Sequence, residues 1–245
     1  MARRQRDTKL PAPYLKTLRW REEAERPNRY PFALPWLTDD FEFAFEEPVT
    51  ILMGENGAGK STLIETVAAI AGFSLAGGGA WVGEPQDGEG PLALAKSLRA
   101  GWLPKIQRGW FLRAGSFENV AGLMASDHLS MSHGEGFASL ISDRMTDQGL
   151  YILDEPEAAL SPRRQAELLA FLADVQNDAS AQVVMATHSP LLMAVPGAAL
   201  YRLTHREISR VDLRDTDHFR LWQAFATDPD GFVAAALDGD LGNLV

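Results

Sequence analysis

The sequence predicts an α/β fold with a mostly parallel sheet, antiparallel strands near the N-terminus and a small helical arm. Short apolar runs typical of buried strands alternate with segments of helical spacing. A glycine-rich loop joins one of these apolar runs to a helix, and a segment of alternating apolar and acidic residues precedes that run. With 245 residues, the chain is long enough for one such domain, and we assign residues 1–245 to it.

The N-terminal elements lead up to the glycine-rich loop. Residues 1–12 are basic with no apolar stretch behind them, and we expect them to be flexible. Residues 41–45 alternate apolar and acidic side chains, which indicates a half-buried strand, and the apolar run 49–53 indicates a buried one. Residues 60–71 carry apolar side chains at helical spacing.

The remaining elements continue the alternation. Residues 75–147 are assigned to the helical arm, in which the glycine-rich stretch 77–90 predicts a loop. The other predicted elements are strands at 110–112, 150–153 and 183–186, helices at 116–124, 135–145 and 162–175, a hairpin of 199–203 with 207–211, and two helices within 216–237 broken at 228–231.

Composition and charge exclude several classes. Hydrophobic residues make up 46% and charged residues 23%, so the chain is not a disordered one. The absence of cysteine excludes disulfides, thiolate metal sites and a cysteine nucleophile. The longest near-apolar run, 191–200, is about half of what a bilayer requires. The basic start lacks the apolar stretch of a secretory signal, so we expect a cytoplasmic protein with no membrane insertion.

Charge is distributed unevenly along the chain. Residues 1–29 hold nine Lys/Arg and four Asp/Glu, whereas the remainder holds 14 basic and 29 acidic residues. An acidic body makes a poor generic nucleic-acid binder, because affinity for phosphate backbones is mostly cationic. The basic start could contact an anion, or it could be a solvated terminus.

The first motif is a phosphate-binding P-loop between a buried strand and a helix. Its backbone N–H groups and the helix N-terminus can surround phosphate oxygens. Lys60 is expected to reach the β- and γ-phosphates of ATP, and the Ser61 hydroxyl to ligate Mg²⁺. The predicted nucleotide-binding residues are Gly54, Glu55, Asn56, Gly57, Ala58, Gly59, Lys60, Ser61 and Thr62.

The second motif is a carboxylate pair at the end of the buried strand 150–153. Ligands bind at this end of parallel strands. Asp154 is expected to hold the Mg²⁺ shell, and Glu155 to polarise an attacking water, with Glu157 as the next candidate for that role. Adjacent strand residues point to opposite faces, so the pair cannot share one task.

Two further motifs contain groups that could bind a phosphate of the nucleotide. Ser132 and the N–H groups from Gly134 onward precede a helix and form either a second anion site or an ordinary capping box. His188 follows the strand 183–186, where it either packs and hydrogen-bonds locally or reaches a γ-phosphate. Its position 34 residues after Asp154, in a chain with a nucleotide site, favours the second interpretation.

Together, over roughly residues 40–205, these motifs resemble the ATPase domain of the ATP-binding-cassette (ABC) superfamily, most closely its small soluble bacterial ATPases. The P-loop looks like Walker A and LYILDE like Walker B. MSHGEG is similar to the signature motif, residues 158–161 (AALS) take the place of the D-loop, and His188 matches the switch histidine. The resemblance implies Mg²⁺-dependent ATP hydrolysis in a homodimer with ATP in its interface.

The resemblance leaves some positions and roles open. The only candidate for the Q-loop glutamine is Gln107, which precedes the strand 110–112 instead of following it. Tyr30 and Phe32 lie where an aromatic could stack on adenine, or they are core residues. Alternatives to a stand-alone ATPase are a subunit of a DNA-repair or phage-defence complex and the nucleotide-binding subunit of a membrane transporter. The sequence names no protein partner.

Overall fold

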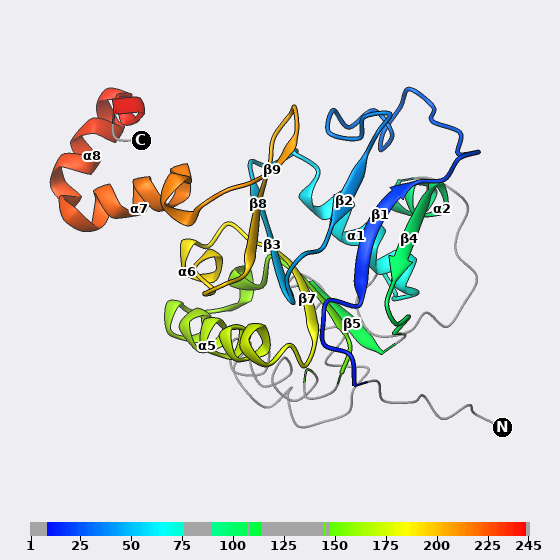
Figure 1. The fold of residues 1–245 in the computed structure, drawn as a ribbon. Coiled ribbons are helices and arrows are strands. Elements are labelled where there is room, and N and C mark those ends of the chain that lie inside the picture. The colour runs from blue at the N-terminus through cyan, green and yellow to red at the C-terminus, as the bar shows by residue number, and fades with distance from the viewer. Residues whose placement is uncertain (1–8, 76–89, 107, 114–144, 146–147, 244–245) are drawn as a thin grey trace.

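The computed structural model describes residues 9–75, 90–106, 108–113, 145 and 148–243. It holds two sheets, one of six strands and one of three, with helices on both faces of the larger one (Figure 1). The α/β class predicted from the alternation of strands and helices is confirmed.

The larger sheet is parallel except at one edge, as predicted. In spatial order its strands are β5 (Gly109–Arg113), β6 (Leu150–Asp154), β7 (Gln182–Ala186), β3 (Val49–Gly54), β8 (Ala199–Leu203) and β9 (Ile208–Arg210). Only β9 pairs antiparallel, as the second strand of a hairpin with β8. Since β3 lies between β7 and β8, and β6 lies beside β7, the carboxyl ends of β3, β6 and β7 meet at one edge.

The smaller sheet is antiparallel and carries strands that the periodicity did not predict. Its order is β2 (Glu42–Ala44), β1 (Leu15–Trp20) and β4 (Leu98–Trp102). In β1, Leu15 and Leu18 are buried while Arg19 is exposed, so its spacing is not a strict alternation. The expected strand 41–45 forms as β2, and the expectation of antiparallel N-terminal strands is confirmed.

The described part of residues 75–147, the segment assigned to a helical arm, holds one short helix and two strands, and one of these strands matches the strand predicted at 110–112. After the short helix α2 (Pro91–Ser97), β4 joins the antiparallel sheet and β5 forms an edge of the parallel sheet. These strands are held by long-range pairing that helical patterning does not report. The predicted helices 116–124 and 135–145, except Met145, lie outside the described residues, as does most of the glycine-rich stretch.

Helices cover the two faces of the parallel sheet. The α1 helix (Lys60–Ala71) packs on one face together with the antiparallel sheet, and α5 (Pro162–Asp178) and α6 (Pro190–Met193) cover the other (Figure 1). Side chains of β3 alternate accordingly: Leu52 joins the first core, and Ile51 and Met53 join the second. Burial on both faces explains why β3, β6 and β7 are nearly continuous apolar runs.

Gly54 ends β3 in a conformation that a larger residue would not tolerate. Its φ is 145°, and an added Cβ would lie 2.2 Å from the carbonyl oxygen of Leu203 on the paired strand β8. Gly57 also has a positive φ, 82°, but an added Cβ would meet nothing within 4 Å. Glycine is therefore required at position 54 because a side chain would have no space, and at position 57 only because of the backbone conformation.

We expect Gly54→Ala to destabilise the protein much more than Gly57→Ala. The second change should cost about 1–2 kcal/mol, the penalty for a left-handed backbone at a non-glycine residue. Gly54→Ala adds a clash between the new Cβ and the Leu203 carbonyl oxygen, which is a backbone atom and cannot rotate away. Thermal denaturation of both variants without nucleotide measures the difference, and equal midpoints would contradict the packing at β8.

The C-terminal helices extend away from the body. The α7 helix (Asp217–Thr227) and α8 (Pro229–Asp238) contain no buried residue, and in Figure 1 they project from the side of the sheet. Asp228 separates them, because its carboxylate accepts from the Gly231 N–H at the start of α8. The two helices broken at 228–231 that the sequence predicts are confirmed. We call residues 217–238 the C-terminal extension.

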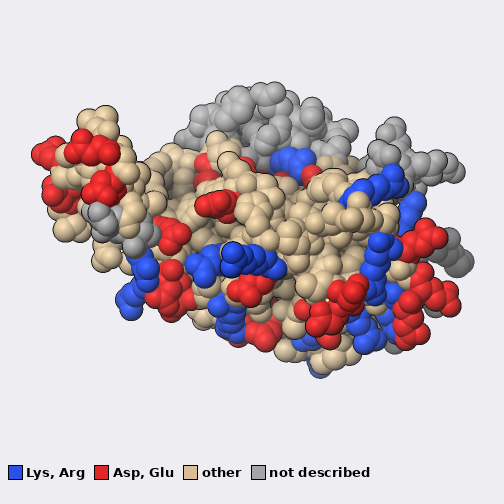
Figure 2. Space-filling view, turned by 90° about the horizontal axis from the view of Figure 1, so that it is seen from above, with Lys and Arg blue, Asp and Glu red and all other residues tan. Residues whose placement is uncertain are grey.

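Charges of both signs lie close together over the face in Figure 2, and carboxylates gather on the C-terminal extension at its left end. Short 3₁₀ helices complete the described elements: Pro156–Ala159, Leu213–Asp215 and Leu241–Asn243. Of the segment predicted to be flexible, residues 9–12 are described, and Ala12 is buried and donates to the Ala179 carbonyl. Among the residues described, no helix is both long and apolar enough to pass through a bilayer.

Candidate nucleotide site

The loop between β3 and α1 holds a buried lysine. Gly59, with φ of 96°, caps the helix that Lys60 begins. The Lys60 ammonium donates to the carbonyls of Gly54 at 2.7 Å and Glu55 at 3.1 Å. Burial lowers the pKa of Lys60, and the nearby carboxylates, of which Glu155 is the strongest, oppose that shift. A buried cation thus lies beside the helix N-terminus, which is the charge arrangement a phosphate requires.

Asp154 lies at the end of β6, next to Ser61 and Arg113. The Ser61 hydroxyl donates to one carboxylate oxygen at 3.5 Å, and the Arg113 Nε contacts the other at 3.0 Å. Arg113 also pairs with Glu65 on α1. Burial raises the pKa of Asp154, while Arg113 lowers it. The arginine thereby compensates a carboxylate that is only 5% exposed.

Ser61 and Asp154 fit a magnesium ion. Hydroxyl and carboxylate oxygens are the ligands that Mg²⁺ prefers, and the ion usually keeps waters and binds substrate phosphates besides one or two protein ligands. In the described part of the chain, no group of three or more His, Asp or Glu side chains forms a metal cage. Two protein oxygens beside a phosphate-binding loop match the Mg²⁺ pattern.

Glu155 lies directly after β6 in a left-handed conformation, with φ of 50° and ψ of 53°. Its N–H donates to the Ala186 carbonyl at the end of β7, so the turn is fixed to the neighbouring strand. One carboxylate oxygen lies 3.6 Å from the His188 Nε2, and the side chain is 45% exposed. The left-handed turn breaks the strand alternation, so this carboxylate faces the end of β7.

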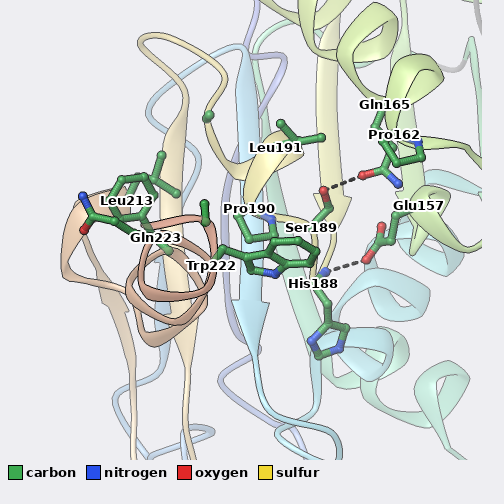
Figure 3. Close-up of a pocket in the computed structure, with 13 residues that line it drawn as sticks. Glu157, Pro162, Gln165, His188, Ser189, Pro190, Leu191, Leu213, Trp222 and Gln223 are labelled. Atoms are coloured by element: carbon green, nitrogen blue, oxygen red, sulfur yellow. Dashed lines mark hydrogen bonds between the residues drawn. The ribbon is translucent and has the colours of Figure 1, made fainter. Parts of the chain in front are cut away.

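Glu157, in contrast, is occupied with local structure. Its carboxylate accepts from the Thr187 hydroxyl at 2.7 Å. It also accepts from the His188 N–H at 2.5 Å (Figure 3). Thr187 in turn accepts from the Ser189 N–H. Glu157 therefore positions the segment after β7 and is a poorer candidate for polarising water than Glu155.

His188 is held between two groups. Its Nδ1 lies 3.4 Å from the His218 Nε2, on α7. Its Nε2 is buried and has no hydrogen-bond partner among the residues that the structure describes, with Glu155 the nearest acid. An unpaired buried nitrogen beside a phosphate-binding loop is available to a ligand oxygen.

An apolar pocket of about 720 Å³ adjoins His188. Trp222 and Leu213 face it from the C-terminal end of the chain, and Pro190 and Leu191 face it from α6 (Figure 3). Gln165 on α5 accepts from the Ser189 hydroxyl at its rim. The pocket separates the base of the C-terminal extension from α5.

The two aromatic candidates for adenine have different surroundings. Phe32 stacks against Trp20, with ring centroids 6.4 Å apart, and belongs to the periphery of the core. The Tyr30 ring is 60% exposed, and its hydroxyl is 2.9 Å from that of Thr62 at the start of α1. Phe32 is thus a packing residue, and Tyr30 lies beside the P-loop.

The structure brings most of the predicted site together. Residues 54–62, Asp154, Glu155 and His188 lie at the shared end of β3, β6 and β7. Ser132, Gly134 and Gln107 lie outside the described residues. Sequence reasoning missed Arg113 and His218. A polar residue ending an apolar strand could have indicated Arg113, but nothing in the tail marks His218.

Two family models match parts of the chain. The family described as "AAA domain" matches residues 32–76, and the family described as "AAA domain, putative AbiEii toxin, Type IV TA system" matches residues 136–194. The chain is similar to the SMC head domain from Thermotoga maritima, with a TM-score of 0.47 and 14% identity over 82% of this chain and 100% of that one.

Similar curated proteins are ATP-binding subunits of importers. The thiamine import ATP-binding protein ThiQ of Cereibacter sphaeroides is 31% identical, over 57% of this chain and 70% of that protein. The molybdenum import ATP-binding protein ModC of Brucella melitensis is 26% identical, over 60% of this chain and 48% of that protein. The chain thus spans about half the length of ModC. On the match to ThiQ, the chain belongs to the ABC-type ATP-binding proteins, which are P-loop ATPases.

Proposed function

We propose that the chain hydrolyses ATP to ADP and phosphate in a Mg²⁺-dependent reaction, in the cytoplasm, as a homodimer that encloses ATP. The observation that carries the proposal is the convergence of Lys60, Asp154 and the Glu155–His188 pair at one sheet edge. Each group has a chemical task that the others cannot perform.

The P-loop supplies phosphate binding. Lys60 leaves the carbonyls of Gly54 and Glu55 for the β- and γ-phosphate oxygens, which are stronger acceptors because they are charged. Ser61 and Asp154 would hold Mg²⁺, which neutralises phosphate charge when bound. The exposed ring of Tyr30, tied to Thr62, is our candidate to stack on adenine.

Glu155 and His188 form the hydrolytic part of the site. Glu155 accepts a proton from water or orients it, which its partly exposed carboxylate supports. His188 donates from Nε2 to a γ-phosphate oxygen, which would satisfy a nitrogen that is otherwise buried without a partner in the described structure. Glu157 holds the backbone of His188 in place for this contact.

The homodimer follows from the resemblance to ABC ATPases. In that fold the signature segment lies far from the P-loop of its own chain, so Ser132 and Gly134 would contact the ATP of a second copy. A two-fold arrangement pairs each P-loop with the partner's signature segment and encloses two nucleotides. Because the signature contacts the γ-phosphate, ATP should stabilise the dimer and ADP should not.

Sedimentation of Glu155→Gln with Mg·ATP and with Mg·ADP tests the dimer. We expect a dimer with ATP and a monomer with ADP. Ser132→Arg should abolish the dimer, since a bulky cation would fill the shared site. A monomer in both nucleotides well above micromolar concentration, or normal phosphate release by Ser132→Arg, would contradict the arrangement.

A transporter subunit is the second candidate. It is supported by the names of the relatives, because ThiQ and ModC are import ATP-binding proteins. Capture of this chain from its own cells would separate the alternatives. A membrane-spanning partner favours the transporter, a nuclease partner favours a DNA-repair or phage-defence complex, and the absence of a partner favours the stand-alone ATPase.

A further inference from the structure

We propose that His218, in the first turn of the C-terminal extension, is a positioning residue for His188. It donates its Nε2–H to the His188 Nδ1 and so fixes the tautomer in which His188 carries its proton on Nε2. The inference rests on the proposed role of His188 and extends the site to a helix that none of the sequence motifs includes.

The geometry gives His188 two neighbours on opposite sides of its ring. Glu155 Oε1 lies 3.6 Å from Nε2, and His218 Nε2 lies 3.4 Å from Nδ1. The two imidazole rings are 5.7 Å apart between centroids. Three titratable side chains, from the segment after β6, the segment after β7 and the start of α7, thus follow one another in a row.

Chemistry selects one distribution of protons along this row. A carboxylate only accepts, so the nitrogen of His188 that faces Glu155 is best protonated. A neutral imidazole has one proton, which leaves the His188 Nδ1 as an acceptor. His218 Nε2 must then be the donor. Without His218, no described residue would favour this tautomer from the Nδ1 side.

The surroundings of His218 keep it neutral. Burial lowers its pKa, and the neighbouring His188 and Lys60 lower it further, whereas Asp217 and Glu55 raise it. A neutral ring has one N–H to donate and one lone pair, as the row requires. At pH 7 and above, His218 therefore acts as a fixed dipole beside His188.

Hydrogen bonds of Thr216 fix the start of the C-terminal extension and thereby the position of His218. Thr216 is fully buried, donates its hydroxyl to the Leu213 carbonyl at 2.6 Å and accepts from the Phe219 N–H at the start of α7. Beyond this turn the helix has no buried residue. The anchored turn presents His218 to the site, while Trp222, one turn on, faces the apolar pocket.

Nitrogen NMR of protein labelled with ¹⁵N-histidine tests the tautomer at pH 8 without ATP. The chain has five histidines, and loss of a signal in His188→Gln assigns His188. We expect protonated Nε2 and bare Nδ1 in the wild type, a tautomer mixture in His218→Leu, and recovery in His218→Gln, whose amide still donates. The matched control, Gln223→Ala, changes an exposed residue of the same helix. An unchanged His188 in His218→Leu would overturn the proposal.

Kinetics provide the second test. His218→Leu should lower kcat for ATP about tenfold with little change in KM, the size expected when an outer partner of a functional histidine is lost. In a His188→Ala background the same change should cost nothing more, because the two act as a unit. Additive losses would overturn the proposal. If wild-type protein releases no phosphate from Mg·ATP, the proposed function fails, and the tautomer measurement still decides the role of His218.

Discussion

Replacing Glu155 with glutamine is expected to lower ATP turnover by about 10²–10⁴-fold while ATP still binds. The amide keeps the shape of the side chain and its place after β6, but it cannot accept a proton from water. The hydrogen bonds of the P-loop lysine do not change, because Lys60 donates to the loop carbonyls and not to Glu155. Single-turnover phosphate release and calorimetric ATP binding measure the two effects separately.

Two variants control this experiment. Glu207→Gln removes an exposed carboxylate in the β8–β9 turn and should leave turnover unchanged. Glu157→Gln loses part of the contact to Thr187 and the His188 N–H, so its loss should be smaller. Wild-type turnover in Glu155→Gln together with a large loss in Glu157→Gln would move the water-activating role to Glu157.

Lys60→Ala is expected to weaken ATP binding by about 3 kcal/mol, roughly 100-fold, because a charged donor facing two phosphates is lost. Isothermal calorimetry with Mg·ATP measures the change. Lys9→Ala, which removes an exposed lysine distant in sequence from the site, provides the matched control for charge. Unchanged ATP affinity in Lys60→Ala would mean that the loop does not bind the phosphates.

The same variant should not unfold the nucleotide-free protein. The pKa of Lys60 lies below its ordinary value because of burial, so at neutral pH its charged form is less favourable in the folded protein than in the unfolded chain. As the pH falls, this penalty begins to grow near the ordinary pKa of lysine, and it is fully present once the pH lies below the folded pKa. Removing the charge removes that penalty, and thermal denaturation should show a midpoint near that of the wild type.

The central part of the fold was predictable because its strands and helices have characteristic local sequence patterns. The strand β3 and the helix α1 match the segments predicted at 49–53 and 60–71 to within a residue. Strands buried on both faces give apolar runs that few other structures produce. In contrast, β1 and β4 contain Arg19 and Arg99 on a face that solvent reaches, and only their pairing across some 80 residues makes them strands.

The site was predictable to the same extent and for the same reason. Residues 54–62 form one continuous motif, and the two carboxylates after β6 form another, so each motif can be recognised from the order of its own residues. The contacts of Asp154 with Arg113 and of His188 with His218 join residues 41 and 30 positions apart. No periodicity connects such pairs, because their distance is set by the order of strands in the sheet and by the path of the C-terminal extension.

The backbone of Glu155 has a consequence for how this protein can evolve. A left-handed residue that is not glycine costs about 1–2 kcal/mol, a noticeable part of the stability of a domain. Glycine would adopt the same turn without that cost but would carry no carboxylate. Selection for stability alone would favour glycine here. With Glu155 activating water as we propose, the proposed catalytic role and the stability of the fold therefore oppose each other at this position. Descendants that lose the need for hydrolysis should lose this side chain early.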